Sequence, residues 1–96
     1  MTYKLKNGQR PNTTTGTGEL KYPGFTGEVE YEIVGSLDQL RPGVSVRAAI
    51  MTTAEVAEAA FRELRGHLRL ATGKEYRLQM VAYSAGSGTA YAELTV

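Results

Sequence analysis

The chain of 96 residues contains no cysteine and no tryptophan, and it has a single histidine, His67, and a single aspartate, Asp38. Without cysteine it can form neither a disulfide nor a thiolate metal site. One histidine is also too few for the clusters that usually hold zinc. Stability must therefore come from one compact apolar core, which is what a chain of this length can build, with oligomerisation as additional support.

The sequence also lacks a long apolar run. No stretch approaches the roughly 20 apolar residues that a membrane-spanning helix needs. The bases near the N-terminus are not followed by a hydrophobic segment, so the pattern of a secretory signal is missing. We therefore expect no membrane partner and a cytoplasmic location, with which the absence of cysteine agrees.

Charge is nearly balanced, with 11 Lys and Arg against 10 Asp and Glu. It is distributed unevenly, because residues 1–21 and 65–96 carry an excess of bases whereas residues 22–64 carry an excess of acids. No segment has the basic density typical of a protein dedicated to duplex DNA. Nucleic acid is therefore not the partner that the composition favours.

Residues 1–14 are expected to form a flexible N-terminal segment. The run from Asn12 to Gly18 consists of small polar residues and glycine with almost no apolar anchor, a composition typical of mobile ends. Residues 15–96 are expected to form a single globular domain.

From Gly18 onward the apolar residues recur mostly with period two, which predicts strands. A first strand with Leu20 and Tyr22 ends at the turn pair Pro23-Gly24,. The segment Glu28–Ile33 alternates apolar residues with three glutamates, and Val44–Ile50 alternates again. The sequence therefore predicts three strands before residue 52.

A helix is predicted over residues 53–65. The segment Thr52-Thr53-Ala54-Glu55 matches a capping box with Thr52 as the N-cap, and Gly66 is placed to end the helix. The apolar residues of this segment recur at helical spacing and should pack on the sheet as one stripe; they include Val56, Ala57, Ala60, Phe61 and Leu64.

Two hairpins are predicted for the last thirty residues, through the loops Thr72-Gly73-Lys74 and Ala85-Gly86-Ser87. Residues opposite each other in an antiparallel pair share a face, so loops of odd length are needed to keep the leucines together. The pairs expected are Leu70 with Tyr76 and Leu68 with Leu78 in the first hairpin, and Ala82 with Ala90, Met80 with Ala92, Leu78 with Leu94 and Tyr76 with Val96 in the second.

The predicted order is β-β-β-α-β-β-β, which indicates an α+β protein. We expect a mainly antiparallel β roll or a small, partly open barrel with one helix near residues 53–65. This order of elements resembles the oligonucleotide/oligosaccharide-binding fold, although a sixth strand exceeds the usual five. The resemblance is one of element order, and no motif accompanies it.

No arrangement of catalytic residues is recognisable. A Ser-His-Asp triad would need His67, Asp38 and one of four serines, but the G-x-S-x-G elbow that exposes such a serine is missing,. His67 lies between two arginines on a predicted strand, where a solvated surface is the expected setting. We therefore predict no catalytic residue and no enzyme activity.

The three glutamates Glu28, Glu30 and Glu32 share one face of a predicted strand. They would be spaced by about 6.6–7 Å, which is too far apart to hold one ion unaided. A charged outer face that discourages edge pairing is the expected role. We predict no metal site and no cofactor.

The second face of the last hairpin suggests a binding surface. The expected register places Val81 opposite Tyr91 with Tyr83 beside them, on a face that is otherwise polar. Either residues 1–18 cover this patch, or it binds a partner, since exposed tyrosines are common at interfaces. The candidate interaction surface is therefore Val81, Tyr83 and Tyr91.

Two main hypotheses for function follow, and an enzyme that uses carboxylates alone is the least favoured third. The first is a small non-enzymatic protein-interaction module whose partner is either an unidentified protein or a second copy, as a homodimer. The alternative is weak binding of single-stranded nucleic acid on the sheet, with tyrosines stacking on bases. Its candidate basic contacts are Arg65, Arg69, Lys74 and Arg77. The near-neutral charge and the stripe of glutamates count against the alternative.

Overall fold

The computed structural model describes residues 13–96. These residues form β2 (Thr13–Tyr22), β3 (Phe25–Val34), the 3-10 helix η1 (Leu37–Gln39), β4 (Val46–Met51), α1 (Ala54–Glu63), β5 (Arg65–Arg69), β6 (Glu75–Ser84) and β7 (Thr89–Thr95). The predicted order of three strands, one helix and three strands is confirmed. Thr13 and Thr14 belong to β2, although the sequence assigned them to the flexible segment; residues 1–12 lie outside the described part.

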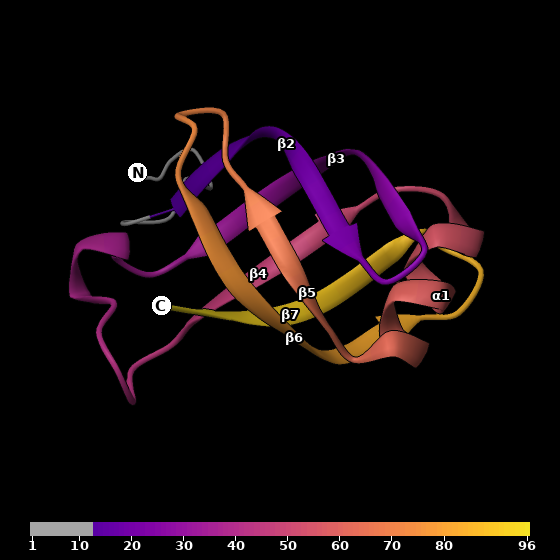
Figure 1. Cartoon of the computed structure of the whole chain (residues 1–96). Coiled ribbons are helices and arrows are strands. Elements are labelled where there is room, and N and C mark those ends of the chain that lie inside the picture. Colours follow the sequence, from indigo (N-terminus) through magenta and orange to yellow (C-terminus); the bar gives the residue numbers. More distant parts are fainter. Residues whose placement is uncertain (1–12) are drawn as a thin grey trace, which may run out of the picture.

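The six strands close into one antiparallel barrel in the order β2-β3-β4-β7-β6-β5, with β5 pairing back to β2. Two three-stranded meanders, β2-β3-β4 and β5-β6-β7, are connected through α1, which lies at one end of the barrel, while η1 lies at the other end (Figure 1). The small α+β barrel is thus confirmed, but it is closed rather than partly open. Six strands also distinguish it from the usual five of the oligonucleotide/oligosaccharide-binding fold. No helix within residues 13–96 is long and apolar enough to cross a membrane.

The barrel interior is filled by alternate side chains of every strand, as closure requires. Leu20, Ile33, Ile50, Leu68 and Leu94 are the largest fully buried ones. The ring of Tyr31 lies opposite Gly16, where a Cβ atom would meet its hydroxyl group. The glycines of β2 therefore make room for this buried ring, whose hydroxyl oxygen accepts a hydrogen bond from the Ala71 N–H at 3.1 Å.

The N-terminus of α1 is capped one residue later than predicted. The Thr53 hydroxyl oxygen accepts the Val56 N–H at 3.2 Å. The Thr52 N–H, which a capping box would pair with the Glu55 side chain, instead donates to the Gly88 carbonyl oxygen at 2.7 Å in the β6–β7 loop,. The expected capping box of Thr52 and Glu55 is therefore wrong.

The C-terminus of α1 also differs from the prediction. The helix ends at Glu63, and Leu64 adopts a positive φ of 71° that turns the chain directly into β5. Leu64 is consequently half exposed and leaves the apolar stripe, in which Ala57 and Ala60 are the buried members. Gly66 lies within β5, where a Cβ atom would collide with the Lys21 carbonyl oxygen. Close approach of two strands, rather than helix termination, requires this glycine.

The first predicted hairpin has the correct face but the wrong register. Leu68 pairs with Tyr76, and Gly66 pairs with Leu78, which is a shift of two residues. The loop is residues 71–73, because the left-handed residue of a three-residue turn, Gly73 at φ 95°, comes last rather than in the middle,. A shift of two preserves the inward and outward faces, so the leucines still share the core.

The second hairpin is confirmed over half of its length. Leu78 pairs with Leu94 and Met80 with Ala92, as expected. A β-bulge between Met80 and Ala82 then shifts the register, so that Ala82 lies opposite Tyr91 and Tyr83 opposite Ala90. The predicted pairs of Ala82 with Ala90 and Val81 with Tyr91 are wrong, because the bulge inserts one extra residue and reverses the alternation beyond it.

Candidate functional site

An apolar surface lies on the outside of β4, β7 and β6. Tyr91 and Val81 are 44% and 51% exposed. Ala82 lies opposite Tyr91 on one side, and Ala49 lies opposite it on the other. Together with Met51 these residues line a shallow hollow of about 630 Å³. We call this set, Ala49, Met51, Val81, Ala82 and Tyr91, the Tyr91 face.

Tyr83 does not belong to this surface. The bulge at Val81 turns its side chain toward α1, where its ring lies 5.1 Å from that of Phe61 at an angle of 44°. The structure therefore brings together Val81 and Tyr91 but separates the third predicted residue from them. Sequence reasoning missed Ala49 and Met51 because they reach this face through the pairing of β4 with β7, a contact between distant segments.

The described part of the N-terminal segment does not cover the Tyr91 face. Residues 13–18 lie in β2, which pairs with β3 and β5. In the ring of six strands β2 lies directly across from β7, which carries Tyr91. Residues 13–18 therefore do not form the predicted cover of this patch. The same prediction for residues 1–12 concerns residues outside the described part.

Charges of both signs border the Tyr91 face. Arg47 has a side chain that is 78% exposed and lies 4.0 Å from the Glu93 carboxylate. Glu32 lies opposite Ala49 on β3, and within residues 13–96 it has no ion pair. Glu32 and Arg47 are diagonal neighbours on β3 and β4, so both charges lie at the same side of the apolar residues.

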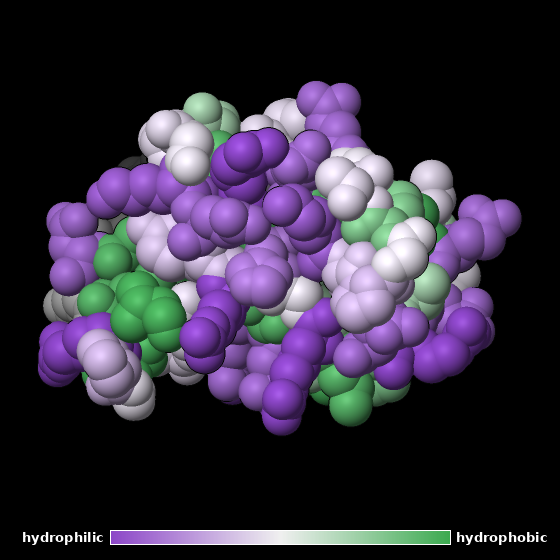
Figure 2. Space-filling model, viewed as in Figure 1, coloured by the Kyte–Doolittle hydropathy of each residue, from purple (hydrophilic) through white to green (hydrophobic). Residues whose placement is uncertain are grey.

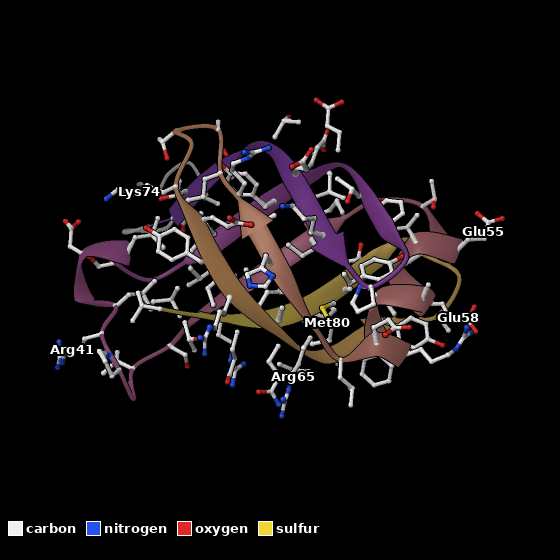
Figure 3. The ribbon with its side chains drawn as sticks, viewed as in Figure 1. Arg41, Glu55, Glu58, Arg65, Lys74 and Met80 are labelled. Atoms are coloured by element: carbon white, nitrogen blue, oxygen red, sulfur yellow. The ribbon has the colours of Figure 1, made fainter. Side chains whose placement is uncertain are left out.

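The four predicted basic contacts do not gather in one place. The Arg69 guanidinium donates to the Glu19 carboxylate at 2.7 Å, so its charge is already balanced. Arg65 and Lys74 lie at opposite ends of the β5–β6 hairpin (Figure 3). Arg65 and Arg77 line one groove, and neither makes an ion pair with a residue that the structure describes.

This groove, which we call the seam groove, follows from how the barrel closes. The strands β2 and β5 pair over only three residues, from Glu19 to Lys21, and the backbone of Gly66 still lies close to Lys21 and Tyr22 beyond this pairing. A hollow of about 730 Å³ lies beside this end of the pairing. A row of three basic residues, each directly opposite the next on the neighbouring strand, runs across this groove: Lys21, His67 and Arg77. Arg65 also lines the groove. Sequence reasoning missed Lys21 because nothing local predicts that β2 closes on β5.

The remaining walls of the seam groove are neutral. Thr26, Gln79 and Thr95 contribute polar side chains, and Tyr22 contributes an aromatic ring. Burial, and secondarily the nearby Glu63 carboxylate, raise the pKa of the Tyr22 phenol above its ordinary value. None of the residues that line the groove is an aspartate or a glutamate. Figure 2 shows mainly hydrophilic side chains over β2, β5 and β6, the strands around this groove.

The structure places the other candidates for chemistry apart. Glu28 and Glu30 are exposed on β3, and Asp38 lies in η1, far in sequence from His67 on β5. Among residues 13–96 no three His, Asp or Glu side chains lie close enough to hold a metal ion. His67 donates to or accepts from no carboxylate or hydroxyl of the described chain.

Two surfaces, the Tyr91 face and the seam groove, are therefore the features that set this barrel apart from a uniformly polar one. Comparisons of the chain with known protein families, with curated proteins and with solved structures find no match.

Proposed function

We propose that the protein is a small non-enzymatic protein-interaction module that associates with a second copy of itself through the Tyr91 face. The observation that supports this function is the contiguous exposure of Tyr91 and Val81 on the outside of a closed barrel. A closed barrel has no free strand edge, so association must use side chains. Tyrosine suits such contacts because it combines a large apolar ring with a polar hydroxyl group.

A second copy fits this surface because the charges at its border complement each other. In a two-fold dimer the Tyr91 face of one copy packs against the Tyr91 face of the other, so every contact between two different residues occurs twice. Arg47 of one copy can then meet Glu32 of the other, and the reverse, beside the apolar residues. Glu32 is without an ion pair among residues 13–96, and Arg47 has only the 4.0 Å contact to Glu93. The surface is small, so we expect a dissociation constant on the order of 10 µM.

The mass of the protein in solution tests this proposal. Sedimentation equilibrium of the wild type should show a dimer that dissociates on dilution. Tyr91→Lys should remain folded and monomeric, since it places a charge at the centre of the Tyr91 face. Thr17→Lys is the matched control, because Thr17 is exposed on β2, across the ring from β7. A wild type that stays monomeric at about 0.5 mM contradicts the proposal, as does a dimer that Tyr91→Lys leaves unchanged.

Binding of single-stranded nucleic acid has less support. Such a surface needs aromatic rings interleaved with free cations along one path. Tyr83 packs against Phe61. The pair formed by Gln79 and Glu93 lies between Tyr91 and the arginines of the β5–β6 hairpin that have no ion pair. The bases of the β5–β6 hairpin and the exposed aromatic ring of β7 therefore lie on different parts of the barrel.

A further inference from the structure

We propose that the seam groove is a binding site for a small organic phosphate, such as a nucleoside phosphate. This site is separate from the Tyr91 face, and the proposal does not depend on self-association. Four basic side chains line the groove, which are Lys21, Arg65, His67 and Arg77. The groove has no acidic lining residue, in a chain whose acids and bases are otherwise almost equal in number.

The arrangement of these side chains leaves positive charge available to an anion. His67 lies directly opposite Lys21 on one side and directly opposite Arg77 on the other, so Lys21 and Arg77 flank it. Of the four, Lys21 alone has an ion pair within the described chain, to Glu75 at 3.8 Å. Arg65 and Arg77 therefore keep their donors available, and guanidinium groups bind phosphate oxygens in pairs.

The shape of the groove favours a small ligand over a polymer. Its volume of about 730 Å³ lies within the range of small-molecule sites,. It lies at the end of the short pairing of β2 with β5, and the buried Leu78 is among its lining residues. Thr26, Gln79 and Thr95 supply neutral hydrogen-bonding groups around the basic row.

The aromatic ring of Tyr22, which lines the groove, indicates what kind of organic group carries the phosphate. Tyr22 lines the groove and stacks on Phe25 at 5.0 Å, so its ring is held in place. A phenol whose pKa lies above its ordinary value of 10.0 is neutral near pH 7, as an ordinary tyrosine is, and so does not repel an anion,. A flat organic group can lie against this ring while its phosphate reaches Arg65 and Arg77. Inorganic phosphate, which lacks that group, should bind more weakly.

The test uses the full chain in a low-salt buffer free of phosphate, with ADP, inorganic phosphate and an eight-residue oligothymidylate as probes. Titrations followed by amide chemical shifts should place ADP at residues 21–22, 65–67 and 77–79. The double variant R65Q/R77Q should bind ADP at least about tenfold more weakly, since it removes two charge-assisted contacts. The matched control Lys74→Gln removes one positive charge from the same hairpin outside the groove, and it should change the affinity less than about twofold.

Three results would overturn the proposal. The first is the absence of shifts at millimolar ADP. The second is equal affinity of the wild type and the double variant, which would make the contact nonspecific. The third is a much tighter complex with the oligonucleotide, with shifts extending to Arg69 and Lys74, which would indicate a nucleic-acid surface instead. Because all these variants keep Tyr91 and Arg47, the mass of the protein reports separately on self-association.

Discussion

The ring of Phe61 on α1 packs against the ring of Tyr83 on β6, with centroids 5.1 Å apart and an angle of 44° between the planes. This contact forms beyond the bulge, at the point where β6 leaves the regular alternation. It joins α1 to the barrel together with the buried Ala57 and Ala60. The bulge therefore removes Tyr83 from the outer surface and gives the helix an aromatic partner.

Phe61→Ala should lower the free energy of unfolding by about 2 kcal/mol. A fully buried phenylalanine would cost about 3–5 kcal/mol, but Phe61 is only partly buried, so less apolar surface is lost,. Tyr83→Ala should cost a similar amount, and the double variant should cost less than the sum because the two rings share one contact. Urea denaturation checks this, and strictly additive losses would show that the rings do not interact.

Substitutions at Leu64 should reveal its backbone conformation, because it is the only described non-glycine residue with a positive φ. Leu64→Gly should be more stable than Leu64→Ala by about 1 kcal/mol, since glycine adopts this conformation without strain. In an ordinary helical or extended position the order is reversed. Thermal unfolding of the two variants distinguishes the cases, and a more stable alanine variant would argue against the left-handed turn at Leu64.

Gly18→Ala should destabilise the barrel by roughly 2–4 kcal/mol or prevent folding, as expected for an overpacked core. A Cβ atom there would collide with the Arg69 carbonyl oxygen, at the short pairing of β2 with β5. Thr17→Ala, one residue away on the exposed face, is the control and should change stability by less than about 0.5 kcal/mol. Equal stability of the two variants would contradict the close approach of these strands.

At alkaline pH, ionisation of Tyr22 should reduce stability. Its pKa in the folded protein is raised above the ordinary value of 10.0, first by burial and then by Glu63. The folded state therefore holds the proton longer than the unfolded chain, and the associated stability is complete below pH 10.0 and is lost as pH rises through the folded pKa,. Unfolding curves recorded below and above this pH window should show a smaller loss of stability for Tyr22→Phe than for the wild type. Identical losses would contradict the raised pKa.

Local patterns were sufficient for the strands, the helix and the inward faces. The alternation of Val29, Tyr31 and Ile33 predicted their burial, and the pairing of Leu78 with Leu94 followed from parity alone. The bulge at Val81 was not predictable in this way, because apolar residues keep a spacing of two from Tyr76 to Ala82 and give no sign of an inserted residue. The seam groove was equally hidden, since Lys21 meets His67 only when the barrel closes across 46 residues of chain.

The charge pairs at the border of the Tyr91 face provide the most direct test of self-association. Arg47→Glu alone and Glu32→Arg alone should each be monomeric, because each variant places like charges opposite each other in a two-fold dimer. An equimolar mixture of the two variants should dimerise, since every contact between the unlike chains is again between opposite charges. Sedimentation equilibrium of the mixture should therefore show a heterodimer at concentrations where both variants alone sediment as monomers. A mixture that remains monomeric while the wild type dimerises, or single variants that dimerise as the wild type does, would contradict the two-fold Tyr91 interface.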